Sequence, residues 1–223
     1  MSTKNNINAP TLEETNKILS PTSGKRSNNN SMNESTKSKM VISLCLISFM
    51  SNASFSQMSP FYPLKAKEKG VTAVYVGFVF GTMAVAQMIS SFLVGKCMHN
   101  FGSVRHIVIM IATLFIIMQT AGLGYLDNVD DEATFLRISF ISQFLGGLGA
   151  GANATASMAI LSSFGAEERE KYIGWIEAAF GLGMLFGPLL GAVMYNYGGY
   201  QCPFITFTII YFLSYPYISW SLI

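Results

Sequence analysis

Residues 181–191 read GLGMLFGPLLG and lie inside a long apolar segment of the chain. Gly183, Gly187 and Gly191 recur at every fourth position, so a helix places them on one face, as a ridge without side chains. A ridge of this kind lets a neighbouring helix approach closely, which is a common way for helices to pack in lipid. Pro188 lies within the ridge, removes one backbone donor and predicts a bend. The stretch therefore predicts a closely packed membrane helix that moves.

The composition of the whole chain agrees with a membrane location. Of its 223 residues, 51% are hydrophobic and 12% are charged, whereas a soluble domain carries about 25% charged residues. Long apolar runs alternate with short charged clusters, and a run of about 20 apolar residues matches the hydrocarbon thickness of a bilayer. The sequence predicts an all-α polytopic membrane protein with the lipid bilayer as its surroundings.

Several other classes of protein are not expected. The net charge of +2 is small and the basic residues are dispersed, so no nucleic-acid partner is predicted. Cys45, Cys97 and Cys202 have the spacing of neither a disulfide framework nor a metal site, and we expect no metal and no cofactor. The sequence has no H-E-x-x-H motif and no paired intramembrane aspartates, so an enzyme is not expected.

The apolar runs divide the chain into a tail and six crossings. Residues 1–39 are rich in Asn, Ser, Thr and Lys, which predicts a disordered polar tail on the cytosolic side. Residues 40–223 are expected to form a six-helix transmembrane domain, with crossings at about 40–62, 74–94, 107–125, 135–164, 172–194 and 204–223. Pro60 and Pro63 are expected to end the first of these helices.

The basic residues of the connections predict a cytosolic N-terminus. In this orientation the cytosolic side holds Lys4, Lys17, Lys25, Arg26, Lys37, Lys39, Lys96, Arg105, Arg169 and Lys171. The outer side holds Lys65, Lys67, Lys69 and Arg137 together with the acidic turn at 127–132. The lysines at 65–69 run against the rule that basic residues stay inside. The membrane itself, whether plasma membrane or vesicle or vacuole membrane, is not distinguished by the sequence.

Five polar side chains within apolar segments are candidates for a solute pathway: Asn52, Ser56, Gln87, Gln143 and Asn153. Polar groups at membrane depth usually face the interior of the bundle or a water-filled cavity. The alternative is that they only form hydrogen bonds to a neighbouring helix. The sequence leaves both interpretations open.

Glu177 is the one carboxylate expected within the membrane, a short distance into the fifth crossing. An intramembrane acid is a functional candidate, because it could hold a proton or pair with a cationic substrate. The alternative is a structural latch near the interface, paired with Arg105 or a neighbouring loop residue. The shallow position of Glu177 favours the latch slightly.

Six crossings, a glycine-flanked loop after the second and a G-x-x-x-G-P-x-x-G helix in fifth place resemble the N-terminal half of the major facilitator superfamily. In the loop GKCMHNFGSVR, Gly95, Gly102 and Arg105 match the loop motif of the superfamily, while His99 replaces its usual aspartate and Asn100 its first basic residue. The fifth crossing is similar to the antiporter motif, through the residues Gly183, Gly187, Pro188 and Gly191. This motif is typical of the branch of drug:proton and vesicular amine antiporters.

The resemblance implies half of a major facilitator fold, as two inverted three-helix repeats, in which Gly77 and Gly81 of the second crossing correspond to Gly183 and Gly187 of the fifth. It also implies that the fifth crossing is a gating helix. The branch usually carries an arginine in the fourth crossing that helps to couple protons, and Gln143 stands at or near its place. A glutamine holds no charge, so the proton coupling that the resemblance implies lacks one of its usual groups.

The leading hypothesis is transport of small solutes, organic cations or drug-like compounds, by alternating access. The superfamily holds its substrate between two six-helix halves, so the resemblance implies a missing C-terminal half or a second copy as partner, with the chain as an N-terminal half or a truncated form. Protons are a further candidate partner. The alternative is a non-transporting membrane scaffold or receptor-like remnant of the same fold.

Overall fold

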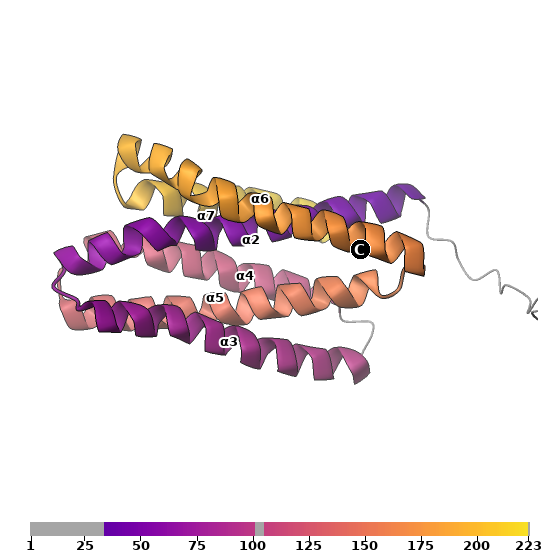
Figure 1. Ribbon diagram of the computed structural model, residues 1–223, viewed down its shortest axis with the longest axis horizontal. Coiled ribbons are helices and arrows are strands. Elements are labelled where there is room, and N and C mark those ends of the chain that lie inside the picture. Colours follow the sequence, from indigo (N-terminus) through magenta and orange to yellow (C-terminus); the bar gives the residue numbers. More distant parts are fainter. Residues whose placement is uncertain (1–33, 101–104, 223) are drawn as a thin grey trace, which may run out of the picture. The chain divides into compact units, whose positions relative to one another are not determined.

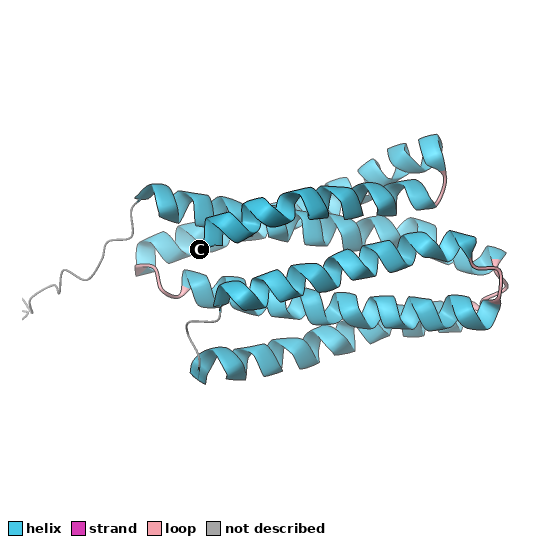
Figure 2. Ribbon diagram, turned by 180° about the vertical axis from the view of Figure 1, so that it is seen from behind, coloured by secondary structure: helices cyan, strands magenta, loops and turns pink. Residues whose placement is uncertain are grey.

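The computed structural model describes residues 34–100 and 105–222, which are helical apart from short connections (Figures 1 and 2). Apart from Glu34, these residues belong to one compact unit, Ser35–Ile223. The helices are α2 (Glu34–Glu68), α3 (Ala73–Asn100), α4 (Arg105–Tyr125), the short η2 (Leu126–Asn128), α5 (Glu132–Leu161), α6 (Ala166–Gly198) and α7 (Gln201–Leu222). Six of the described helices are long and apolar enough to cross a membrane. The predicted all-α multi-pass fold is confirmed. Residues 34–39, which the sequence predicts to belong to the disordered tail, form the beginning of α2, and the rest of the predicted tail lies outside the described residues.

Helix α2 extends beyond its expected end. It continues to Glu68 with Pro60 and Pro63 inside it, so the prediction that these prolines end the helix is wrong. A helix that leaves its regular hydrogen bonding in lipid finds no water to satisfy its backbone, and prolines are therefore tolerated within transmembrane helices. Helix α6 is also longer than expected, and its first residue, Ala166, places Glu177 about three turns inside the helix.

The small residues of α5 let it lie between α3 and α4. A Cβ atom on Gly147 would collide with the backbone carbonyl of Met83 and lie 2.7 Å from Cβ of Ala86, both on α3. A Cβ atom on Gly149 would lie 2.6 Å from the carbonyl oxygen of Ala112 on α4. Close approach of the three backbones explains why the run GGLGAG contains so few side chains. Figure 1 shows α3, α4 and α5 running side by side.

The glycine ridge of α6 packs against α2. A Cβ atom on Gly183 would collide with the carbonyl oxygen of Phe49, and one on Gly187 would lie 2.6 Å from the carbonyl oxygen of Ala53. Gly77 and Gly81 of α3 have no atom within 4 Å of an added Cβ. The two ridges, which the sequence pairs as counterparts, therefore have different surroundings.

Two of the three lysines that run against the charge rule, Lys65 and Lys69, form ion pairs in the structure. Lys65 of α2 forms an ion pair with Asp127 of η2, and Nζ of Lys69 lies 2.8 Å from Oδ1 of Asp130. These contacts join the end of α2 to the connection between α4 and α5. Hydrogen bonding to Lys69 holds the pKa of the Asp130 carboxyl below its usual range. Acidic residues of the α4–α5 connection therefore neutralise two of the three lysine charges locally.

Asp131 caps the N-terminus of α5. The amide and the hydroxyl of Thr134 donate to its Oδ2 at 2.9 and 2.6 Å, and hydrogen bonding to Thr134 lowers the pKa of the Asp131 carboxyl. The carboxylate therefore adds stability that is present above its unfolded pKa of about 4 and is lost as the pH falls through the lower folded pKa. Asp131→Ala is expected to lower the Tm in detergent by about 2 to 4 °C at neutral pH.

Asp131→Asn is the control for this prediction, because asparagine caps helices about as well but does not titrate. Asp131→Asn should have a Tm close to that of the wild type at neutral pH. Its Tm should lack the decrease at acidic pH that protonation of Asp131 causes in the wild type. Equal Tm values for the alanine variant and the wild type would contradict the assigned cap.

Candidate functional site

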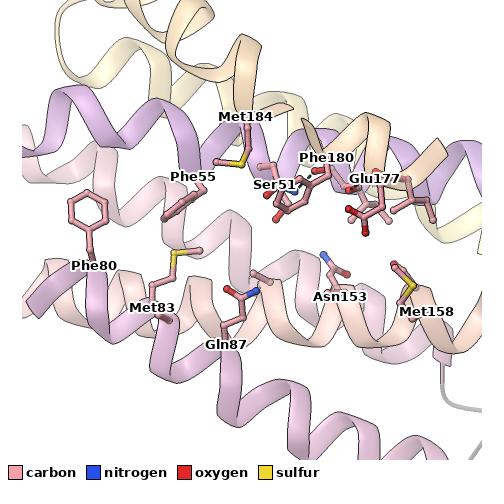
Figure 3. A pocket seen from close by; sticks show the side chains of 18 residues that line it. Ser51, Phe55, Phe80, Met83, Gln87, Asn153, Met158, Glu177, Phe180 and Met184 are labelled. Atoms are coloured by element: carbon pink, nitrogen blue, oxygen red, sulfur yellow. Dashed lines mark hydrogen bonds between the residues drawn. The ribbon is translucent and has the colours of Figure 1, made fainter. Parts of the chain in front are cut away.

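A cavity of about 330 Å³ lies between four helices, α2, α3, α5 and α6 (Figure 3). Its volume is within the range of small-molecule sites, about 300 to 1,000 Å³. It is lined by Ile47, Ser48, Ser51, Asn52, Phe55, Phe80, Met83, Ala84, Gln87, Ala150, Asn153, Ala154, Ser157, Met158, Ile176, Glu177, Phe180 and Met184. Four of the predicted site residues are brought together here: Asn52, Gln87, Asn153 and Glu177.

Asn153 and Gln87 extend into the cavity from α5 and α3, and Glu177 extends from α6 on the opposite side (Figure 3). Asn153 is only 4% exposed, and neither its Nδ2 nor its Oδ1 has a hydrogen-bond partner among the described residues. A buried amide without partners is unfavourable, so this side chain is suited to bind a polar group in the cavity. Its NH₂ group can donate hydrogen bonds to, and its carbonyl oxygen can accept hydrogen bonds from, the same molecule.

Glu177 is exposed, and the described residues provide it with neither an ion pair nor a hydrogen bond. The latch interpretation requires such a pair with Arg105 or a loop residue. Arg105 begins α4, and its Nε also has no partner among the described residues. Among the described residues that line the cavity, Glu177 is the only one with an ionisable carboxyl.

Aromatic and thioether side chains form much of the remaining cavity wall. Phe55 of α2, Phe80 of α3 and Phe180 of α6 contribute rings, and three methionines line the same space: Met83, Met158 and Met184. The faces of aromatic rings attract cations, and methionine adapts to ligands of irregular shape. Phe180 and Met184 lie three and seven positions after Glu177, on the same face of a helix, and this spacing could have identified them in the sequence.

Gln143 lies away from the cavity, in the core of the bundle. It is fully buried, its Oε1 accepts a hydrogen bond of 2.7 Å from Nε2 of Gln119, and its own Nε2 donates to Sδ of Met58 at 2.8 Å. A Cβ atom on Gly146 would collide with Gln119, so the glycine provides space for this amide. The pair joins α2, α4 and α5 through uncharged groups.

The amide pair gives a stability prediction. Gln143→Leu leaves Nε2 of the buried Gln119 with only the sulfur of Met83, at 3.9 Å, as acceptor and should lower the free energy of unfolding by about 1 to 3 kcal/mol. The double variant Gln119→Leu/Gln143→Leu removes both partners and should be more stable than the single variant. Denaturant unfolding in detergent measures this, and strictly additive losses would contradict the proposed pairing.

Ser56 and, within the loop motif, Gly95 and Arg105 also lie outside the cavity lining. The hydroxyl of Ser56 donates to the backbone carbonyl of Met184 at 2.7 Å. Gly95 is part of α3, where an added Cβ would lie 3.8 Å from Thr155. His99 falls in the last turn of α3, and Gly102 lies outside the described residues.

Comparisons with known proteins agree with this architecture. The sequence profile of the Major Facilitator Superfamily matches residues 44–222. The chain is 31% identical to the mouse MFS-type transporter SLC18B1 over 163 residues, which cover 73% of this chain and 35% of that protein. It is 28% identical to the human protein of the same name over 178 residues, covering 79% and 38%.

A bacterial drug-resistance protein is also similar. The class B tetracycline resistance protein of Escherichia coli is 28% identical over 163 residues, covering 72% of this chain and 37% of that protein. These relatives match the drug and amine antiporter branch that the sequence motifs indicate. The chain spans between 35% and 38% of the length of these three relatives.

Proposed function

Since the chain belongs to the major facilitator superfamily, we propose that it takes part in the transport of small organic cations or drug-like solutes across its membrane. In this proposal it acts by alternating access, as the N-terminal half or a truncated form of such a transporter, with its N-terminus in the cytosol. A C-terminal half or a second copy would complete the solute pathway.

The observation that carries the proposal is the chemistry of the cavity. Glu177 supplies a negative charge without a partner among the described residues, three phenylalanine rings surround the space, and Asn153 offers an unpaired amide. A charge at membrane depth is costly unless it is compensated. An organic cation with an aromatic group satisfies the carboxylate and the rings together.

Glu177 is also the group that we assign to any proton coupling. Gln143 stands near the place of the branch arginine, yet it is uncharged and buried in an amide pair. A proton and a cationic solute would compete for the one carboxylate in the cavity, and such competition is a simple basis for exchange.

Uptake into vesicles tests the function. Membrane vesicles from cells that express the chain would be filled with acidic buffer and diluted into neutral buffer, which imposes a pH gradient. Radiolabelled benzyltrimethylammonium, an aromatic cation of permanent charge, would then be added outside. Accumulation above that of vesicles without the protein, abolished by a protonophore, is the expected result. Binding without accumulation, also when a C-terminal half is expressed with the chain, would instead support the scaffold or receptor-like alternative, and absence of both would overturn the proposed solute class.

A further inference from the structure

Pro188 creates a defect in the hydrogen bonding of α6. Proline has no N–H, so the carbonyl four residues earlier, that of Met184, loses its partner within the helix. Helix α6 nevertheless continues through Pro188 to Gly198. In a transmembrane helix, a carbonyl freed in this way is satisfied by a side chain of a neighbouring helix, an ordered water or a local change of helix geometry.

The replacement donor comes from α2. The hydroxyl of Ser56 donates to the carbonyl oxygen of Met184 at 2.7 Å, and Ser56 itself is buried. The glycine ridge allows this contact, because an added Cβ on Gly187 would lie 3.1 Å from Cβ of Ser56. The hydrogen bond lost at Pro188 within α6 is therefore re-formed between the two helices.

This contact coincides with the edge of the cavity. Helix α6 contributes Ile176, Glu177, Phe180 and Met184 to the lining. The hydroxyl of Ser48, two turns before Ser56 on α2, lies 3.4 Å from the carbonyl oxygen of Ile176. The part of α6 that lines the cavity thus begins and ends at carbonyls that serine hydroxyls of α2 contact.

We propose that Ser56 is a positioning residue: its hydroxyl takes the place of the donor missing at Pro188 and holds the cavity-lining segment of α6 in register with α2. This inference deepens the proposed function and rests on it, because the segment carries the carboxylate assigned to the solute. The sequence marks Ser56 as a pathway candidate. In this proposal Ser56 does not contact the solute: it fixes the backbone of α6 and thereby the position of Glu177.

The contact can be observed directly at one carbonyl. Met184–Leu185 is the only Met–Leu pair in the sequence. Protein labelled with ¹³C at the methionine carbonyl and ¹⁵N in leucine therefore gives a single carbonyl–amide correlation in NMR spectra of the full chain in detergent. Ser56→Ala should shift the Met184 carbonyl resonance upfield, as expected when a carbonyl loses a hydrogen bond, and Ser56→Thr should retain most of the original shift.

A double-mutant cycle with Pro188 separates this role from general packing. Pro188→Ala restores the backbone donor, so Ser56→Ala should weaken the binding of benzyltrimethylammonium about threefold or more with Pro188 present and leave it nearly unchanged in the Pro188→Ala background. Ser59→Ala, at an exposed position of the same helix, is the matched control and should have no effect in either background.

Each outcome decides a separate point. Equal effects of Ser56→Ala in both backgrounds, or an unchanged carbonyl resonance, would overturn the positioning role. If Pro188→Ala does not fold, the Ser56→Thr variant provides the test, because it keeps the hydroxyl. The proposal is contradicted if Ser56→Thr loses probe binding and shifts the Met184 carbonyl resonance as much as Ser56→Ala does. Absence of probe binding by the wild type would refute the proposed function, whereas the carbonyl resonance would still show whether Ser56 binds Met184.

Discussion

Glu177→Gln is expected to weaken the binding of benzyltrimethylammonium at least tenfold, which corresponds to about 1.4 kcal/mol. The substitution keeps the size of the side chain and removes the charge that faces the cavity opposite Asn153 (Figure 3). Titration of the purified full chain in detergent with the radiolabelled probe measures the effect.

Two controls isolate the charge in this experiment. Neopentylbenzene has the shape of the probe but carries no charge, so its binding should change little in Glu177→Gln. Glu170→Gln removes a carboxylate from the same helix at a position that does not line the cavity, and should preserve binding of the cation. Equal loss of both ligands in Glu177→Gln would show damage to the cavity and would contradict the assigned attraction.

Gly183→Ala and Gly81→Ala are expected to change stability in opposite directions. The Cβ atom added at Gly183 meets the carbonyl of Phe49, so α2 and α6 must separate, and overpacking of this kind costs about 1 to 3 kcal/mol. At Gly81 no atom lies within 4 Å of the added Cβ, so the better helix propensity of alanine should stabilise the protein by up to about 1 kcal/mol.

The sign of the difference makes this comparison informative, because the two substitutions are chemically identical and both lie in apolar helices. Thermal unfolding of the two variants in the same detergent provides the measurement. Gly183→Ala should also weaken binding of the cationic probe, since its helix carries Glu177 and Phe180. A stabilised Gly183→Ala variant would mean that the ridge does not pack against α2.

The fold was largely predictable from the sequence because hydropathy alone decides which segments enter a bilayer. All six crossings correspond to helices of the described chain. The helix ends were not predictable in the same way. Pro60 and Pro63 stop helices in water, yet α2 continues through both, because a bilayer removes the competing hydrogen bonds that favour stopping.

The residues of the site were only partly predictable. Gln87, Asn153 and Glu177 stand out as polar groups in apolar segments, and the cavity brings them together. Gln143 and Ser56 stand out equally, but they satisfy other groups of the protein: an amide on α4 and a carbonyl freed by a proline on α6. A polar residue in an apolar segment indicates that its side chain needs a hydrogen-bond partner. Only the packing of the helices shows which group is that partner.

The ion pairs between the end of α2 and the α4–α5 connection have a consequence for biosynthesis. In the proposed orientation, Lys65 and Lys69 must cross the membrane when α2 is inserted, before Asp127 and Asp130 have been synthesised. During that interval Lys65 has only Glu68 of the same helix as an acidic partner, and Lys69 lacks the partner that it has in the structure. The remaining excess of basic charge opposes the topology that the finished protein adopts. We therefore expect the acidic connection, which the ribosome makes about sixty residues later, to stabilise the orientation of α2 once it reaches the same side of the membrane.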